Sequence, residues 1–179
     1  MSYLEDIDVA HAALLIMHYQ ADVFSILQND IPADLLGRTN SLIADWRTTG
    51  SSVVFANFAI DYGSSHENNM LINNIMKTGF FRDPAPVDGL NMVEGDLRYA
   101  CPRANVFHRT SLDHDLQVEG IKTLVMAGVA SSGVLFSTVG WASDADYKIY
   151  IVRDCCYDPD PVAHEALFRT SFATRATIL

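Results

Sequence analysis

The sequence has few basic residues and no long apolar run. Its 12 lysines and arginines are outnumbered by 22 aspartates and glutamates, which gives a formal net charge of −10. Because no basic stripe is present to neutralise phosphates, nucleic acid and anionic membrane surfaces are not expected as partners. No apolar run approaches the roughly 20 residues that a membrane-spanning helix needs, so a transmembrane protein is not expected either.

Cysteine is also scarce. Two of the three cysteines, Cys155 and Cys156, are adjacent and make a poor disulfide framework, which favours a reducing compartment. Residues 1–15 carry acids where a signal peptide would carry bases, so export is not expected. These features predict a cytoplasmic location.

The chain contains enough apolar residues to form one large core. Its 179 residues suit a single domain over residues 1–179. A hydrophobic content of 49% with only 19% charged residues fits a sheet that is covered on both faces.

Short apolar runs alternate with segments of helical periodicity. The expected strands are Ala12–His18, Val53–Phe58, a short strand within Arg98–His108 that ends near Phe107, Thr123–Ala127, Lys148–Val152 and Ala176–Leu179. The expected helices are Pro32–Thr49, Asn68–Lys77, Leu112–Glu119, a buried helix that ends near Asp144, and Pro161–Ser171. This alternation predicts a three-layer α/β/α sandwich around a mostly parallel sheet of five or six strands.

The segment Lys122–Asp146 organises this expected fold. Its strand turns through small residues into a helix, with Ser131 or Ser132 as the expected N-cap. Such a turn leaves unpaired N–H groups, and ligands bind at the carboxyl ends of strands in open α/β sheets. The turn is therefore predicted to form the floor of a pocket at the ends of the first, second and fourth strands. The alternative is a purely structural crossover turn.

Three segments carry a resemblance to a known family: ALLIMHYQ near the start, RANVFHRTSLDHDLQVEGIKTLVMAGVASSGVLFST in the middle, and DADYKIYIVRDCCYDPDPVAHEALF near the end. They resemble the isochorismatase-like (cysteine hydrolase) family, which includes nicotinamidases and carbamoylsarcosine amidases. The resemblance implies the same fold, a small-molecule substrate and assembly as a homo-oligomer, either a dimer or a tetramer.

The resemblance fails at the catalytic triad. The family's aspartate, lysine and cysteine fall on His18, Cys101 and Val134. Valine has no nucleophilic group, so a thioester route through this position is excluded.

Other chemistry stays open. His18 would act as acid or base, with Cys101, Ser131 or Ser132 as candidate nucleophile and the turn amides as an oxyanion cradle. A protonated His18 would also suit the vinyl ether hydrolysis that some family members perform without a nucleophilic cysteine. The structural alternatives are a hydrogen-bonded histidine, an inert buried thiol and a capping serine.

Candidate substrate-binding residues surround the expected pocket: Arg103, His108, Phe58, Ser131, Gly133 and Val134. Arg103 suits a carboxylate, although an ion pair with an acidic side chain would explain it equally well. Asp61 and His66 resemble part of the metal-binding loop of nicotinamidases, but they offer too few ligands for a full site. Neither a metal nor a cofactor is expected.

The sequence therefore predicts an isochorismatase-like hydrolase that acts on a small, cyclic or aromatic molecule by a non-standard mechanism with His18 as acid or base. One alternative is an inactive pseudoenzyme that binds a small ligand or a protein partner. Another is a lyase or isomerase that uses the same pocket.

Overall fold

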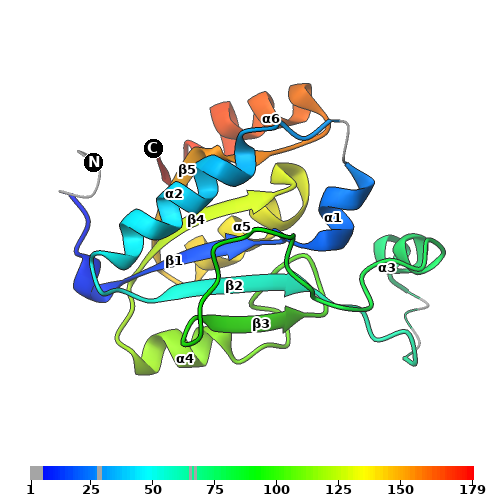
Figure 1. Ribbon diagram of the computed structural model, residues 1–179, viewed down its shortest axis with the longest axis horizontal. Helices are drawn as coiled ribbons and strands as arrows, with labels where there is room; N and C mark the ends of the chain where they lie inside the picture. Colours follow the sequence, from blue (N-terminus) through cyan, green and yellow to red (C-terminus); the bar gives the residue numbers. More distant parts are fainter. Residues whose placement is uncertain (1–5, 28–29, 65, 67) are drawn as a thin grey trace.

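The computed structural model describes residues 6–27, 30–64, 66 and 68–179; the first five residues of the acidic start considered above lie outside it. Within these residues six strands form one sheet in the order β3-β2-β1-β4-β5-β6, and all neighbouring strands are parallel (Figure 1). The strands are β1 Ala12–Met17, β2 Val53–Phe58, β3 Leu97–Cys101, β4 Thr123–Val129, β5 Lys148–Tyr157 and β6 Thr177–Ile178. This confirms the predicted α/β class.

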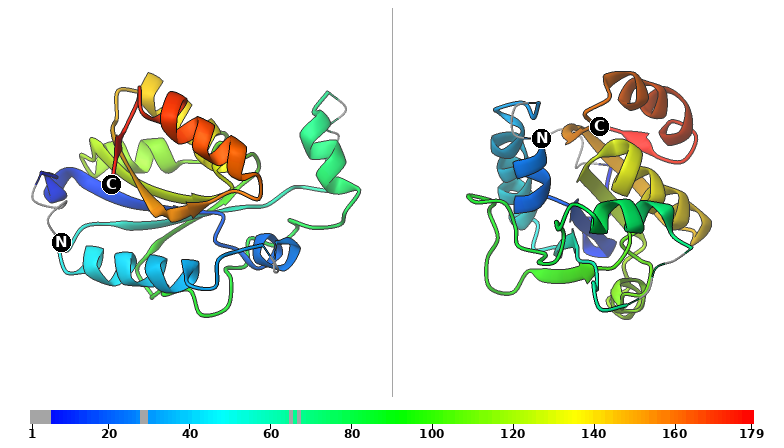
Figure 2. Two further views of the ribbon diagram at one scale, coloured as in Figure 1. Left: turned by 90° about the horizontal axis from the view of Figure 1, so that it is seen from above. Right: turned by 90° about the vertical axis from the view of Figure 1, so that its right-hand side faces the viewer.

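Helices cover both faces of the sheet (Figure 2). The α-helices are α1 Ala21–Ile26, α2 Leu35–Arg47, α3 Met70–Met76, α4 Leu112–Val118, α5 Phe136–Asp144 and α6 Pro161–Leu167. The short helical turns are η2 Val9–His11, η3 Ser131–Leu135 and η4 Phe168–Phe172, of which the last two are π-helical. No helix among the described residues is long and apolar enough to cross a membrane.

Alternate residues of the strands build the two cores, because successive side chains of a strand point to opposite faces. On β1, Ala13, Leu15 and Met17 belong to the core that contains residues of α4 and α5. Ala12, Leu14 and Ile16 belong to the core that contains residues of α2. All six are buried, which explains why β1 is apolar at every position.

The prediction of a strand that ends near Phe107 is wrong. β3 ends at Cys101, because Pro102 has no N–H group to continue the ladder. Phe107 lies in the following loop, where its ring stacks on that of Trp141 at 4.3 Å between centroids. The segment after β3 is therefore a loop, and its side chains lie beside the carboxyl ends of the strands.

Other boundaries also differ from expectation. β1 ends at Met17, since His18 has a positive φ of 57°. The long helix begins at Leu35 rather than at Pro32, and β5 continues to Tyr157 rather than ending at Val152. Helix α1, which follows β1 directly, is absent from the sequence-based prediction.

Candidate functional site

A cavity of about 230 Å³ lies at the carboxyl ends of β1, β2 and β4, where the sequence predicted a pocket. We call it the His18 pocket. Its lining consists of His18, Val23, Ile26, Leu27, Phe58, Leu71, Ile75, Phe81, Ala104, Val129, Ala130, Gly133 and Val134. Among these residues only His18 has an ionisable side chain, and none has a thiol or a hydroxyl group. The described lining is therefore mainly apolar and contains no thiol or hydroxyl nucleophile.

The end of β1 positions His18. Its backbone adopts a left-handed conformation, and its N–H group donates to the carbonyl of Ala56 at 2.9 Å. The residue is only 7% exposed, and its Nε2 has no hydrogen-bond partner among the described residues. Burial lowers the pKa of His18 to about 3, because the protonated ring would lose its hydration. At neutral pH His18 is thus a neutral imidazole.

Phe58 forms a wall of the same pocket, and the buried side chain of Gln20 fixes its backbone. Gln20 donates through Nε2 to the Phe58 carbonyl at 3.1 Å and accepts from the Phe58 N–H at 2.7 Å. The Phe58 ring lies 5.4 Å from the His18 ring and 5.4 Å from that of Phe81, the latter in edge-to-face geometry. Three rings therefore enclose a space that suits a flat apolar group.

Cys101 does not line the His18 pocket. Its Sγ lies 3.7 Å from the carbonyl oxygens of Tyr99 and Val106, and no hydrogen bond joins it to His18. Burial raises the pKa of the Cys101 thiol to about 12. Such a thiol is protonated at neutral pH, so the geometry gives no support to an activated Cys101–His18 pair.

The turn after β4 differs from the prediction in its hydrogen bonds. Neither serine caps the helix through its side chain, and the peptide bond between Val129 and Ala130 is cis. The N–H of Ser132 donates to the carboxylate of Asp158 at 2.6 Å, and the N–H of Gly133 donates to the Ala130 carbonyl at 3.1 Å. The expectation of bare amides therefore fails for both residues, because protein groups already occupy these donors.

Ser131 pairs with a histidine other than His18. Its buried Oγ lies 3.0 Å from Nδ1 of His164, on α6, and 3.4 Å from the carbonyl of Tyr157. Burial lowers the pKa of His164, with the nearby Arg153 as a smaller cause. Ser132 is exposed and is not among the described residues that line the His18 pocket. The structure thus brings His18, Phe58, Gly133 and Val134 together and leaves both serines out.

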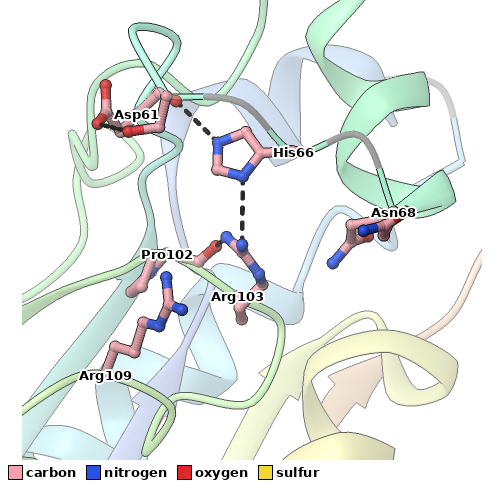
Figure 3. Close-up of a pocket in the computed structure, with 8 residues that line it drawn as sticks. Asp61, His66, Asn68, Pro102, Arg103 and Arg109 are labelled. Carbon is pink, nitrogen blue, oxygen red and sulfur yellow. Dashed lines mark hydrogen bonds between the residues drawn. The ribbon is translucent and has the colours of Figure 1, made fainter.

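A second, polar cavity of about 550 Å³ lies beside the loops that follow β2 and β3 (Figure 3). We call it the arginine pocket; its lining consists of Asp61, Ser64, His66, Asn68, Asn69, Pro102, Arg103 and Arg109. It contains Arg103, one of the predicted substrate-binding residues. His108, another of them, is exposed and lines neither pocket.

Asp61 and His66, which resemble part of a metal-binding loop in the sequence, both have described positions in the structure. Among the described residues, no three His, Cys, Asp or Glu side chains come together in a way that would hold a metal ion. Asp61 and His66 lie in the arginine pocket, where Nδ1 of His66 faces Arg103 at 3.3 Å. The described donor set around His66 therefore does not fit a metal ion.

Sequence reasoning missed two groups of residues. One is the wall contributed by α1 and α3, namely Val23, Ile26, Leu27, Leu71 and Ile75. The helical spacing of the apolar residues after Gln20 was an available signal for α1. The other is the pair Asp158 and His164, whose contacts with the turn join residues 26 and 33 positions apart and leave no local pattern.

The fold and the pocket define an α/β protein with a ligand cavity at the carboxyl ends of parallel strands. The model of the isochorismatase domain matches residues 12–179, and the chain belongs to this family. The resemblance inferred from the three sequence segments is thereby confirmed.

Individual relatives show how distant the similarity is. Over 95 residues the chain is 32% identical to the ureidoacrylate amidohydrolase RutB of Methylobacterium radiotolerans, a match that covers 53% of this chain and 36% of that protein. The match thus spans about a third of the length of this curated relative.

Solved structures share the fold at lower sequence identity. A cysteine hydrolase from Pseudomonas syringae has a TM-score of 0.80 at 17% identity, covering 96% of this chain and 89% of that chain. The pyrazinamidase of Pyrococcus horikoshii, solved in complex with zinc, has a TM-score of 0.77 at 18% identity, covering 94% and 98%. The N-carbamoylsarcosine amidase of Thermoplasma acidophilum has a TM-score of 0.73 at 20% identity, covering 93% and 94%.

Proposed function

We propose that this chain binds a small, mainly apolar molecule in the His18 pocket without forming a covalent bond to it. The observation that carries the proposal is the lining of the pocket: among the described lining residues the only ionisable side chain is a neutral imidazole, and none has a thiol or hydroxyl group. Covalent catalysis needs an activated nucleophile within reach of the substrate. Binding needs only shape and a few placed polar groups, which this pocket provides.

His18 would give the ligand its orientation. A neutral imidazole offers one N–H donor and one acceptor nitrogen, and Nε2 has no protein partner among the described residues. A buried polar group without a partner costs free energy, so a ligand atom that hydrogen-bonds to it gains affinity. The rings of Phe58 and Phe81 favour a flat or aromatic ligand. A small aromatic amide combines both properties.

The second candidate is a hydrolase, or a lyase or isomerase, that acts without a covalent intermediate and uses His18 as its base. The unpartnered Nε2 of His18 favours it, because this nitrogen would accept a proton from water or substrate. The lowered pKa weighs against it, since a good general base has a pKa near the working pH. The lowered pKa weighs more strongly against His18 as a general acid, because at neutral pH only about one His18 ring in ten thousand would be protonated.

Two variants separate pocket binding from general surface binding. A Cβ atom added at Gly133, which lines the pocket, has no atom of another segment within 4 Å, so we expect that Gly133→Leu fills the pocket and keeps the fold. Gly140 on α5 is equally unobstructed and lies outside the pocket, so Gly140→Leu is a matched control. Benzamide binding would be followed by chemical-shift changes in NMR spectra. We expect saturable binding in the wild type and in Gly140→Leu, and loss of binding in Gly133→Leu.

Activity would be tested in the same preparations. Ureidoacrylate, N-carbamoylsarcosine and pyrazinamide are the compounds named by the relatives, and ammonia release from each would be measured. We expect no release above the buffer blank. Release by the wild type that is lost in His18→Asn would replace the proposal by the second candidate. Equal benzamide binding by the two glycine variants would show that this pocket is not the binding site.

A further inference from the structure

The arginine pocket is an unusual feature in such an acidic chain. It lies where the loop after β2, the start of α3 and the loop after β3 meet, and two of its lining residues, Arg103 and Arg109, are cationic (Figure 3). The chain has nine arginines, and among the described residues three of them, Arg38, Arg47 and Arg153, form ion pairs with the carboxylates of Asp34, Asp96 and Glu165.

Arg109 has no such partner among the described residues. It lies in the loop after β3, its side chain is exposed, and its guanidinium makes no ion pair or hydrogen bond with any described residue. Figure 3 shows this group pointing into the pocket together with that of Arg103. An arginine presents a planar fork of donors that matches the two oxygens of a carboxylate or a phosphate. Arg109 therefore offers its donors to the cavity.

Arg103 is held in place by neutral groups. It donates to the carbonyl of Pro102 at 2.6 Å, and its other terminal nitrogen lies 3.3 Å from Nδ1 of His66. His66 Nε2 lies 2.9 Å from the carbonyl oxygen of Asp61, which can only accept, so the hydrogen is on Nε2. Nδ1 is then an acceptor, and it takes a hydrogen bond from Arg103. The charge of Arg103 is oriented by His66 but is not neutralised by it.

Among the described residues that line the same pocket, one, Asp61, is acidic. The carboxylate of Asp61 accepts from the N–H of Gly63 at 2.8 Å and from the hydroxyl of Ser64, and it forms no ion pair with either arginine among the described residues. These hydrogen bonds lower the pKa of Asp61, so it stays ionised. Among the described lining residues, two guanidinium groups thus accompany one carboxylate that is already hydrogen-bonded, so the described side chains carry an excess of positive charge.

We infer that the arginine pocket binds the oxyanion group of a small molecule, a carboxylate or a phosphate, between Arg103 and Arg109. An anion placed there would relieve the repulsion of two like charges and accept a forked pair of hydrogen bonds from each arginine. The cavity volume of about 550 Å³ lies within the range of small-molecule sites, roughly 300 to 1,000 Å³. This site is separate from the proposed apolar site, although Ala104, which lines the His18 pocket, follows Arg103 directly.

The test titrates the full chain with sodium phosphate and, separately, with sodium succinate, at constant ionic strength adjusted with sodium chloride. Binding would be read from the arginine side-chain N–H signals in NMR spectra and from calorimetry. We expect saturable binding of at least one of the two anions, and the tighter one identifies the oxyanion. Arg109→Gln, which removes a guanidinium group that has no partner among the described residues, should weaken this binding by about tenfold or more. Arg103→Gln should have a similar effect.

Arg169→Gln is the matched control, because Arg169 is an exposed arginine that lies outside the arginine pocket. This variant should bind the anion as tightly as the wild type does. Binding that does not saturate, or that is equal in Arg109→Gln and Arg169→Gln, would overturn the inference. Gly133→Leu should retain anion binding while losing benzamide, so failure of the apolar site and failure of this site are distinguishable.

Discussion

The His18 pocket and the arginine pocket lie at the same edge of one sheet but differ in polarity and charge. The His18 pocket is lined mainly by apolar side chains, and the one ionisable group among its described lining residues is in the neutral form at neutral pH. The arginine pocket is lined by polar side chains that include two permanently charged arginines. Burial, more than residue type, therefore decides whether an ionisable side chain in these pockets carries a charge.

The two pocket histidines make this point directly. His18 is 7% exposed, and its Nε2 forms no hydrogen bond with a described residue. Burial lowers the pKa of this ring to about 3. His66 is partly exposed, and both of its ring nitrogens have partners, one a carbonyl oxygen and the other Arg103. The first histidine therefore keeps a ring nitrogen without a described partner, whereas the second orients the guanidinium group of Arg103.

The largest expected difference between the pockets is in their tolerance of charge. Val134→Asp would place an unpaired carboxylate at a position that is 1% exposed, and it should lower the free energy of unfolding by about 3 to 5 kcal/mol. Arg109→Gln, at the exposed pocket, should change it by no more than about 0.5 kcal/mol. Urea unfolding of both variants checks this. Similar stabilities would mean that the His18 pocket is open to water.

A smaller effect is expected from the titration of His18. Its pKa is about 3 in the folded protein against an ordinary 6.5, so between these pH values only the unfolded state binds this proton. The contribution of His18 to stability is thus complete above pH 6.5 and is lost on acidification. Relative to His18→Asn, the wild type should lose about 1.4 kcal/mol of unfolding free energy for each pH unit below about 6. Parallel stability curves would contradict the lowered pKa.

The smallest expected effect is an absence of reaction. All three cysteines are buried, and burial raises the pKa of each thiol. Native protein should therefore take up almost no iodoacetamide during the time in which urea-unfolded protein takes up three equivalents. Mass spectrometry measures the uptake. Rapid native labelling at Cys101 would revive the thiol–imidazole hypothesis.

The sequence predicted the sheet well because a buried parallel strand is apolar at every position. Val53–Phe58 has the predicted bounds, and the floor of the His18 pocket follows β4 as expected. Where prediction failed, a single local feature overrode the pattern. Pro102 ended β3 early, and the positive φ of His18 ended β1 one residue before the apolar run suggested.

The site was less predictable because its contacts join distant segments. The pairing of Ser131 with His164, and the capture of the Ser132 amide by Asp158, cannot be inferred from local spacing. The position of Cys101 outside the pocket depends on how its loop packs rather than on its alignment with the family's lysine. The cytoplasmic location and the dimeric or tetrameric assembly stay predictions.

The measurement that tests the central claim most directly is an NMR titration of the His18 imidazole. The chain has six histidines, and the His18 signals are those missing from the spectrum of His18→Asn. From about pH 8 to about pH 5 the His18 ring should remain neutral, with ring-nitrogen chemical shifts that do not move. A sigmoidal transition of His18 centred near its ordinary pKa of 6.5 would contradict the claim, because a ring that titrates there is solvated and available for acid–base catalysis.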